Sequence, residues 1–250
     1  MSSAEWLWMP RLPYVPLRAE PNHRSEQVSE LLWGEPQQIL DEYKGWVLVR
    51  GRMDGYVGWV EAGTLHYAFY DGSGWGIVRV RQTKLIYEGR TQGWVSFGAL
   101  FPQSGCWHTA MGRYWISSAA LIPWKSRPLS LRLFYRVFAG TPYRWGGKTP
   151  FGIDCSGLTQ LAYRWCGRLI PRDAYQQAEA ALPVETPQKG DFVFFTAHGS
   201  QRISHVGLYI GRDKILHATP AQGVHIGTLR ELYTHTFHSF RTLLTQDFVI

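Results

Sequence analysis

Residues 142–166 read PYRWGGKTPFGIDCSGLTQLAYRWC, a loop rich in glycine and proline that runs directly into a helical pattern. Apolar residues recur after the loop at Leu158, Leu161, Ala162, Trp165 and Cys166. These offsets of three, four, seven and eight are typical of the buried stripe of an amphipathic helix. Asp154 stands where the N-cap belongs. The pattern therefore predicts that Cys155 lies in the first turn of a helix.

A cysteine in that position faces unpaired backbone N–H groups and the positive end of the helix dipole. Both favour the thiolate, which is the nucleophilic form of the side chain. Cys155 is therefore a candidate nucleophile. Its position alone fits equally well a small buried residue that packs the start of the helix.

Two histidines flank a predicted hairpin in the last quarter of the chain. Residues 203–210 alternate as a strand does, and a three-residue loop at 211–213 would pair residue 205 with residue 219. His205 and His217 would then share a face as diagonal neighbours, roughly 7–8 Å apart at Cα. With Cys155 they form a set of nucleophile, base and orienter. In that scheme Cys155 attacks a carbonyl with its own N–H in the oxyanion hole, His205 carries the proton to the leaving amine, and His217 fixes the tautomer of His205.

Length, charge and cysteine content narrow the function classes. A chain of 250 residues exceeds one typical domain. The net charge is +7, but Lys and Arg are scattered without dense runs, so nucleic-acid binding is not favoured. Cys155 and Cys166 are eleven residues apart on one predicted helix, roughly 16 Å, which is too far for a disulfide. With Cys106 they are read as reduced thiols, which favours a cytoplasmic protein.

The first seventeen residues, MSSAEWLWMPRLPYVPL, lack the basic start and unbroken apolar core of a signal peptide. No run of about eighteen apolar residues occurs, so no membrane span is expected.

The first 124 residues read as short strands with glycine-rich turns, the pattern of small β-barrels. The phrases GWVEAGTL (58–65) and RYWISSAAL (113–121) align and suggest two related barrels, although a third phrase, GWVSFGAL (93–100), blurs the register. We expect domains at 1–66, 67–124 and 125–250.

In the last of these domains helices are followed by antiparallel strands, so an α+β class is expected. Ser130 is placed to cap a helix that Gly140 closes, a second helix opens at 171–174 and runs to about 181, and 190–195 reads as a buried strand.

Six motifs carry a resemblance to the NlpC-type bacterial cell-wall cysteine peptidases, in the order and spacing of that family. They are Tyr143-Arg144-Trp145-Gly146-Gly147, Asp154-Cys155-Ser156-Gly157, Pro171-Arg172-Asp173, Gly190-Asp191, Ser204-His205-Val206-Gly207 and His217-Ala218. The resemblance implies a papain-like α+β domain preceded by two SH3-like β-barrels. It also implies a Cys-His-His triad at Cys155, His205 and His217, with Tyr143 assisting the oxyanion hole.

The two SH3-like domains make the chain similar to the YkfC-like subgroup. That likeness implies hydrolysis of murein peptides between γ-D-Glu and the diamino acid, on free peptides with an unblocked N-terminal L-Ala. It implies that the substrate cleft is lined by Trp145, Asp154, Ser156 and Asp173, and closed by Glu26 and Tyr56 from the first SH3-like domain. Asp173 would hold the L-Ala ammonium. Glu26 and Tyr56 could equally be a surface carboxylate and a barrel-core tyrosine. Ala174 departs from the serine that the subgroup often has, which puts fine specificity in question.

The resulting hypothesis is a cytoplasmic cysteine peptidase of murein-peptide recycling, acting as a monomer without a cofactor or metal. A secreted or periplasmic endopeptidase acting on intact wall is one alternative. A non-hydrolytic acyltransferase and a peptide-binding module are others. A zinc site built from Cys155, His205 and His217, or from His198 and His225, is disfavoured because the chain lacks the usual close ligand pairs.

Overall fold

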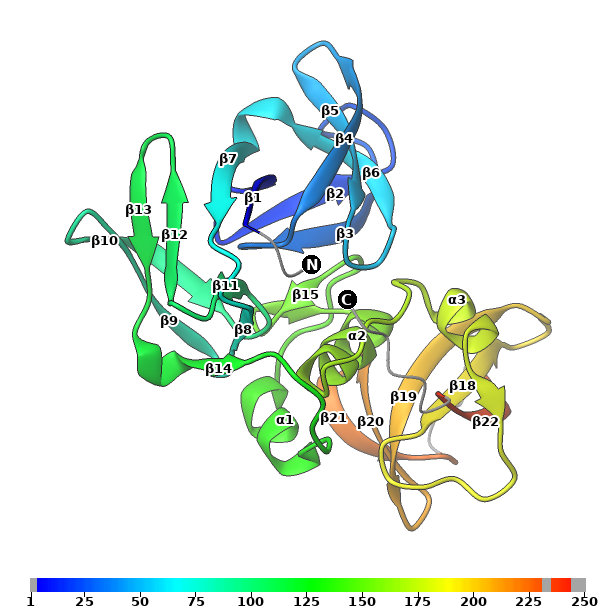
Figure 1. Ribbon diagram of the computed structural model, residues 1–250. Helices are drawn as coiled ribbons and strands as arrows, with labels where there is room; N and C mark the ends of the chain where they lie inside the picture. Colours follow the sequence, from blue (N-terminus) through cyan, green and yellow to red (C-terminus); the bar gives the residue numbers. More distant parts are fainter. Residues whose placement is uncertain (1–3, 231–234, 244–250) are drawn as a thin grey trace. The chain divides into compact units, whose positions relative to one another are not determined.

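The computed structural model describes residues 4–230 and 235–243 and divides the chain into two compact units, Met1–Lys125 and Ser126–Val249 (Figure 1). Among these described residues, no helix is long and apolar enough to span a membrane.

The first unit consists of short antiparallel strands. They are β1 (Glu5–Pro10), β2 (Tyr14–Arg18), β3 (Gln27–Leu32), β4 (Gln37–Tyr43), β5 (Trp46–Gly51), β6 (Val57–Glu61), β7 (Leu65–Tyr70), β8 (Trp75–Val78), β9 (Gln82–Tyr87), β10 (Arg90–Ser96), β11 (Leu100–Pro102), β12 (Cys106–Thr109), β13 (Gly112–Trp115) and β14 (Leu121–Pro123). Eleven of them form one continuous sheet in the order β10-β9-β13-β12-β7-β1-β4-β5-β6-β2-β3, and the other three form a sheet in the order β11-β8-β14.

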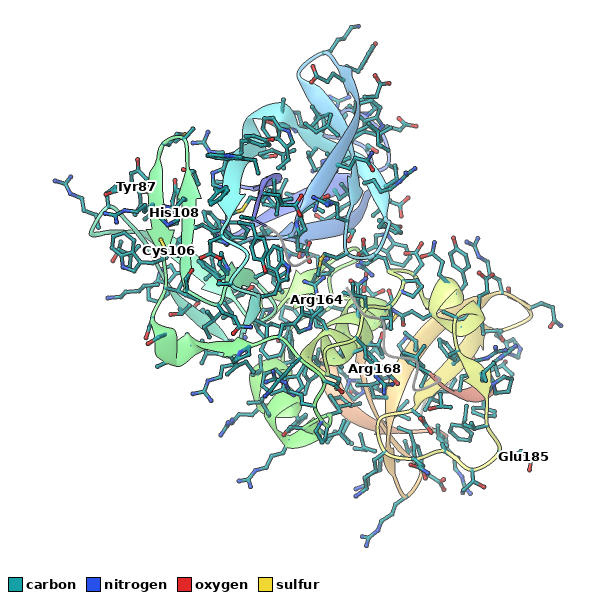
Figure 2. All side chains as sticks on the ribbon, viewed as in Figure 1. Tyr87, Cys106, His108, Arg164, Arg168 and Glu185 are labelled. Carbon is teal, nitrogen blue, oxygen red and sulfur yellow. The ribbon has the colours of Figure 1, made fainter. Side chains whose placement is uncertain are left out.

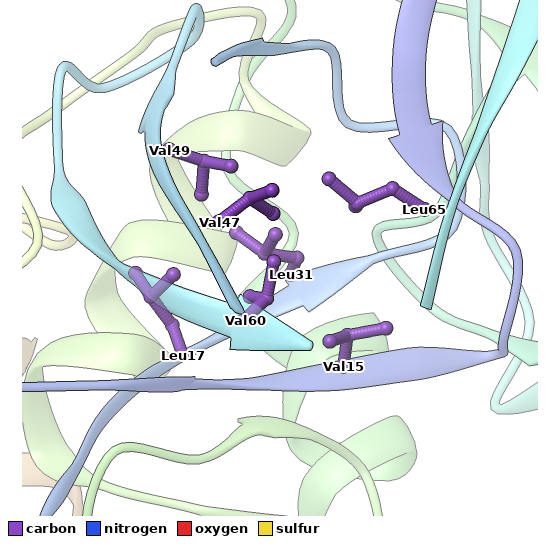
Figure 3. Packing of buried hydrophobic residues seen from close by; sticks show 7 residues of the cluster. All are labelled: Val15, Leu17, Leu31, Val47, Val49, Val60 and Leu65. Atoms are coloured by element: carbon purple, nitrogen blue, oxygen red, sulfur yellow. The ribbon is translucent and has the colours of Figure 1, made fainter. Parts of the chain in front are cut away.

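A compact apolar core fills the space between the first strands (Figure 3). Val47 and Val49 on β5 illustrate why: residues two apart on a strand point to the same face, and both side chains are buried. The full cluster is Val15, Leu17, Leu31, Val47, Val49, Val60 and Leu65. Each such side chain stabilises the fold by about 1.5–3 kcal/mol when fully buried.

The later strands of this unit pack through aromatic rings. Trp33 stacks on Phe101 with ring centroids 6.3 Å apart, and its carbonyl accepts a hydrogen bond from the Leu100 N–H at 2.9 Å. Gly34 makes this approach possible, because a Cβ there would lie 1.9 Å from the Leu100 carbonyl oxygen.

The aligned repeat phrases share a local structure. A strand, a 3-10 turn and a second strand occur at β6, Ala62–Thr64 and β7, and again at β13, Ser118–Ala120 and β14. Strand β7 crosses the expected boundary at residue 66 and pairs with β1 on one side and β12 on the other. The division of this unit into two domains stays a prediction.

The second unit is α+β, as its sequence predicts. Its elements are α1 (Leu131–Phe138), β15 (Lys148–Thr149), β16 (Gly152–Ile153), α2 (Cys155–Trp165), α3 (Ala174–Glu179), β17 (Leu182–Pro183), β18 (Phe192–Ala197), β19 (Ile203–Gly211), β20 (Lys214–Thr219), β21 (Gly223–Thr228) and β22 (His235–Thr242). The last six strands form one antiparallel sheet in the order β17-β22-β18-β19-β20-β21. Helix α2 packs against β19 and β20 (Figure 1).

Helix starts follow the expected caps. The Ser130 side chain accepts a hydrogen bond from the Leu133 N–H at 3.3 Å, and the Asp154 carboxylate accepts one from the Gly157 N–H at 2.7 Å. Helix α3 ends at Glu179, two residues before the expected end. The expectation of one buried stripe on α2 is too narrow, because all eleven of its residues are buried, including Arg164 (Figure 2).

The β19–β20 hairpin has the predicted register but a different turn. Leu208 pairs with Leu216 and Tyr209 with Ile215, as a three-residue loop would require. The turn is instead the two residues Arg212 and Asp213, both with positive φ (54° and 57°), and the register shifts between Tyr209 and Gly211. The bulge and the shorter turn compensate each other, so His205 and His217 still share a face.

Candidate active site

Cys155 is held at the junction of helix α2 and strand β19. It is the first residue of α2, and its side chain is buried. The backbone N–H groups of Val206, on β19, and of Ser156 donate hydrogen bonds toward its sulfur. The thiol therefore lies against the strand segment that carries His205.

The pKa of Cys155 is raised to about 12, chiefly by burial and then by the negative charge of Asp154, although the Val206 N–H, Arg172 and the Ser156 N–H act to lower it. The sequence-based expectation that the helix end favours thiolate is therefore outweighed, because desolvation penalises the charged form more than the N–H groups stabilise it. Burial therefore favours the neutral thiol over the thiolate before substrate arrives.

His205 and His217 form a buried hydrogen-bonded pair. The distance from His205 Nε2 to His217 Nδ1 is 3.0 Å, and the side chains are 4% and 1% exposed. Gly207 allows a close approach to strand β20 here, since a Cβ at that position would lie 3.1 Å from the Cβ of His217. The predicted placement of the two histidines on one face is confirmed.

His225 extends this pair to three imidazoles. It lies directly across from His217 in the β20–β21 ladder, and the two Nε2 atoms are 3.1 Å apart. The sequence suggested His225 only as a zinc ligand, so its contact with His217 was not predicted. The position of His225 on the strand after His217 was the signal that could have predicted this contact. The rings form a line in which His217 uses one nitrogen toward each neighbour. Within the described ranges, no three His, Cys, Asp or Glu side chains are grouped to hold a metal ion.

Asp154 forms a buried ion pair with Arg172, at 2.7 Å between Oδ2 and Nη2. Its Oδ1 also accepts from Arg172 Nη1 at 3.1 Å, and its Oδ2 from the Gly146 N–H at 2.9 Å. Together with the cap to Gly157, these contacts join the loop, the first turn of α2 and the segment before α3. Arg172 lies in the Pro171-Arg172-Asp173 motif, but the sequence pattern did not predict its contact with Asp154.

Ser156 belongs to the same network. Its hydroxyl accepts from Arg172 Nη1 at 2.8 Å, and its carbonyl accepts from Gln177 Nε2 at 3.0 Å. Gln177 lies on α3 and accepts from the Thr159 hydroxyl at 2.7 Å. The polar face of α2 is therefore buried because α3 supplies its hydrogen-bond partners.

Glycines allow the loop to approach the helix. A Cβ at Gly157 would lie 2.4 Å from the Gly147 carbonyl oxygen, and one at Gly147 would lie 2.5 Å from the Gly152 carbonyl oxygen. This close backbone packing explains why these positions of the Gly-Gly and Asp-Cys-Ser-Gly motifs carry glycine.

Three further residues predicted for the site are Tyr143, Trp145 and Asp173. Burial raises the pKa of Tyr143, and negative charge at Cys155 and Asp154 raises it further, so its hydroxyl stays protonated and can donate. Trp145 is 60% exposed on the loop. Asp173 is the N-cap of α3, and its N–H donates to Gln176 Oε1 at 3.1 Å in a capping box.

Glu26 and Tyr56 belong to the other unit, Met1–Lys125. Glu26 is exposed, and Tyr56 is half-buried and packs against the apolar core around Val49. Their role in substrate binding stays a prediction.

Two family models match the chain. The NlpC/P60 family matches residues 140–241, and the bacterial dipeptidyl-peptidase Sh3 domain matches residues 17–65. The first match contains Cys155 and all three histidines of the line described above.

Two curated relatives illustrate the likeness. The gamma-D-glutamyl-L-lysine dipeptidyl-peptidase of Bacillus subtilis (strain 168) is 43% identical over 98 residues, which are 38% of this chain and 33% of that protein. The murein DD-endopeptidase MepS/murein LD-carboxypeptidase of Escherichia coli (strain K12) is 40% identical over 102 residues, 40% of this chain and 53% of that protein. The chain thus spans a third to about half of the length of these relatives.

A solved structure supports the architecture. An NlpC/P60 family protein from Bacillus cereus superposes with a TM-score of 0.81 at 21% identity, covering 96% of this chain and 100% of that one. The likeness confirms the fold class, a papain-like α+β domain preceded by SH3-like β structure. By its sequence, the segment 140–241 of this chain is an NlpC/P60 domain.

Proposed function

We propose that this protein is a cysteine peptidase that hydrolyses murein peptides between γ-D-glutamate and the diamino acid that follows it. The observation that carries the proposal is the buried Cys155 thiol at the start of α2, hydrogen-bonded by Val206 beside the His205–His217 pair. A nucleophile, a base and a group that orients the base are the parts that acyl transfer requires.

The proposed reaction proceeds through a thioester. Cys155 Sγ attacks the γ-carbonyl carbon of D-Glu while its proton passes to His205. His205 then returns this proton to the nitrogen of the diamino acid as the C–N bond breaks. A water molecule, deprotonated by His205, attacks the thioester and releases the carboxylate and the free thiol.

The oxyanion of each tetrahedral intermediate needs donors. The N–H of Cys155 is the first donor we assign, because the first N–H groups of a helix have no intrahelical acceptor. The Tyr143 hydroxyl, kept protonated by its raised pKa, is the second donor we assign.

For the substrate, we propose a free peptide with an unblocked N-terminal L-Ala. The names of the Bacillus subtilis relative and of the Sh3 family model support a dipeptidyl-peptidase. Trp145, Asp154, Ser156, Asp173, Glu26 and Tyr56 stay the predicted substrate residues. We assign Asp173 to the ammonium group, and Asp154 and Ser156 to the wall of the cleft that Arg172 braces.

We further propose a cytoplasmic location, which the free state of Cys106, Cys155 and Cys166 supports. The second candidate function is cleavage of intact wall, which the name of the Escherichia coli relative favours.

Mass spectrometry of products separates these readings. The protein is incubated with L-Ala-γ-D-Glu-meso-diaminopimelate, with its N-acetylated form and with intact peptidoglycan. Release of L-Ala-D-Glu from the free peptide alone supports the recycling enzyme, whereas cleavage of peptidoglycan supports the second candidate. No cleavage of any of the three would overturn the proposal and favour a transferase or binding module.

A matched pair of variants tests the nucleophile. Cys155→Ala should fold normally and lose turnover to below about 1% of the unaltered protein. Cys166→Ala, a half-buried cysteine at the end of the same helix, should keep it. Activity retained in Cys155→Ala would refute the assignment of the nucleophile.

A further inference from the structure

A line of three imidazoles ends on a backbone carbonyl. His205 Nε2 lies 3.0 Å from His217 Nδ1, and His217 Nε2 lies 3.1 Å from His225 Nε2. The remaining nitrogen of the last ring, His225 Nδ1, lies 3.0 Å from the Gly223 carbonyl oxygen. Each contact is a hydrogen bond, so each must have one donor and one acceptor.

The carbonyl determines the proton positions along this line when the rings are neutral. A carbonyl oxygen only accepts, so His225 Nδ1 carries a proton and His225 Nε2 is left with a lone pair. His217 Nε2 must then donate to that lone pair, which leaves His217 Nδ1 as an acceptor. His205 Nε2 in turn donates to His217 Nδ1, and the lone pair of His205 is confined to its Nδ1.

We propose that His225 is a positioning residue that fixes the tautomers of His217 and His205, so that His205 Nδ1 is the atom that accepts the thiol proton of Cys155. The inference rests on the proposed cysteine-peptidase function. His225 contacts His217 alone among the three proposed catalytic residues in the hydrogen bonds described here, and acts through it.

The anchor of this line is held rigidly. Gly223 has a φ of +66°, and a Cβ there would lie 2.2 Å from the Thr141 carbonyl oxygen. The next residue, Val224, donates its N–H to that same oxygen at 2.8 Å, and its own carbonyl accepts from the Gly140 N–H at 3.0 Å. The carbonyl of Gly223 is therefore positioned by the loop that precedes the Gly-Gly motif.

Without His225, two tautomers of His217 become available. If His217 carried its proton on Nδ1, it would turn a donor toward His205 Nε2 and force His205 to hold its proton on Nδ1. With a proton already on Nδ1, the nitrogen that we assign to the Cys155 thiol, His205 cannot accept the thiol proton. The neutral imidazole pair would then divide between a competent and an incompetent arrangement.

Nitrogen-15 NMR of the full-length protein reads these tautomers directly. With histidine labelled, the long-range couplings of each ring distinguish Nδ1–H from Nε2–H at a pH where the rings are neutral. The expected pattern is Nδ1–H at His225 and Nε2–H at both His217 and His205. Finding Nδ1–H at His217, or Nε2–H at His225, would overturn the proposal.

Two substitutions add a kinetic measurement. His225→Leu removes the acceptor, and we expect kcat to fall about tenfold with KM changed less than twofold, because the hydrogen bond that selects the tautomer of His217 is lost. His225→Gln restores an acceptor oxygen and should recover most of kcat. His238→Leu, which removes an exposed histidine on β22, is the matched control and should leave kcat unchanged. Equal kcat in the Leu and Gln variants would contradict the proposal.

The two proposals fail separately. If the unaltered protein cleaves none of the peptides, the proposed function fails whatever the tautomers are. If it cleaves them but the ring protons differ from the expected pattern, only the role of His225 fails. Because the NMR measurement uses the unaltered protein, it decides the question even if His225→Leu does not fold.

Discussion

Replacing Arg172 with methionine removes the cation from the buried ion pair with Asp154 and keeps much of the apolar volume. The two side chains are 1% and 8% exposed, and the guanidinium donates to both carboxylate oxygens, at 3.1 and 2.7 Å. The same group donates to the Ser156 hydroxyl at 2.8 Å. The substitution therefore leaves a carboxylate in a buried site without its counter-charge.

The loss of stability depends on which hydrogen bonds Asp154 keeps after the substitution. Removing one partner of a buried ion pair costs about 3–5 kcal/mol. Asp154 still accepts from the N–H groups of Gly146 and Gly157, at 2.9 and 2.7 Å, so the lower end applies. We expect Arg172→Met to destabilise the Ser126–Val249 unit by about 3 kcal/mol. The matched control is Arg52→Met, which removes a pair of similar length, 3.0 Å to Glu5, with side chains 35% and 30% exposed. That loss should be about 0–1 kcal/mol.

The assay must follow each unit separately, because two units need not unfold together. Urea unfolding of the full chain, read by hydrogen-exchange mass spectrometry on peptides from each unit, does so. Adding Asp154→Asn to Arg172→Met removes the unpaired charge and should recover part of the loss. A cost below about 1 kcal/mol for Arg172→Met, or a double variant in which the two losses simply add, would refute the reasoning.

Three further outcomes are expected. Tyr143→Phe should lower kcat about a hundredfold with little change in KM if the hydroxyl is an oxyanion donor, and steady-state kinetics on the free tripeptide measure this. Gly157→Ala should cost at least about 2 kcal/mol in urea unfolding, because its Cβ would meet the Gly147 carbonyl oxygen at 2.4 Å, whereas Gly63→Ala, with nothing within 4 Å, should be tolerated. Burial and the nearby Arg11 lower the pKa of His66 from 6.5 to about 4, so the unfolded chain binds the proton first. The contribution of neutral His66 to the free energy of unfolding of the Met1–Lys125 unit should therefore be complete above pH 6.5. About 3 kcal/mol of that free energy should be lost as the pH falls toward 4, and His66→Phe should abolish this part of the pH dependence.

Local signals in the sequence predicted the parts of the site that depend on neighbours along the chain. The cap at Asp154 and the start of α2 depend on a side chain and an N–H group three residues away. The alternation of β19 fixed which residues share a face, and the register survived an incorrect turn length because the bulge and the two-residue turn offset each other.

The parts that the sequence did not reveal depend on contacts between distant segments. Arg172 reaches Asp154 across eighteen residues, and nothing in the spacing of the two signals the pair. The full burial of α2 was missed because its polar face is covered by partners such as Gln177 from α3. A hydrophobic stripe predicts which face meets the sheet, but it cannot predict that a second element will bury the polar face.

Cys155 shows how a local rule and a long-range effect compete at one atom. The helix start supplies N–H groups that favour thiolate, but burial and the charge of Asp154 raise the pKa to about 12. A thiol that stays protonated cannot attack until a base takes its proton, so the direction of the His205 lone pair matters more here than beside a cysteine that is already ionised. We propose that the Gly223 carbonyl sets that direction. It fixes the proton position on His225, and the hydrogen bonds from His225 to His217 and from His217 to His205 then fix the tautomer of His205. Under the proposed mechanism, the burial that disfavours the thiolate therefore makes proton transfer depend on the tautomer of His205.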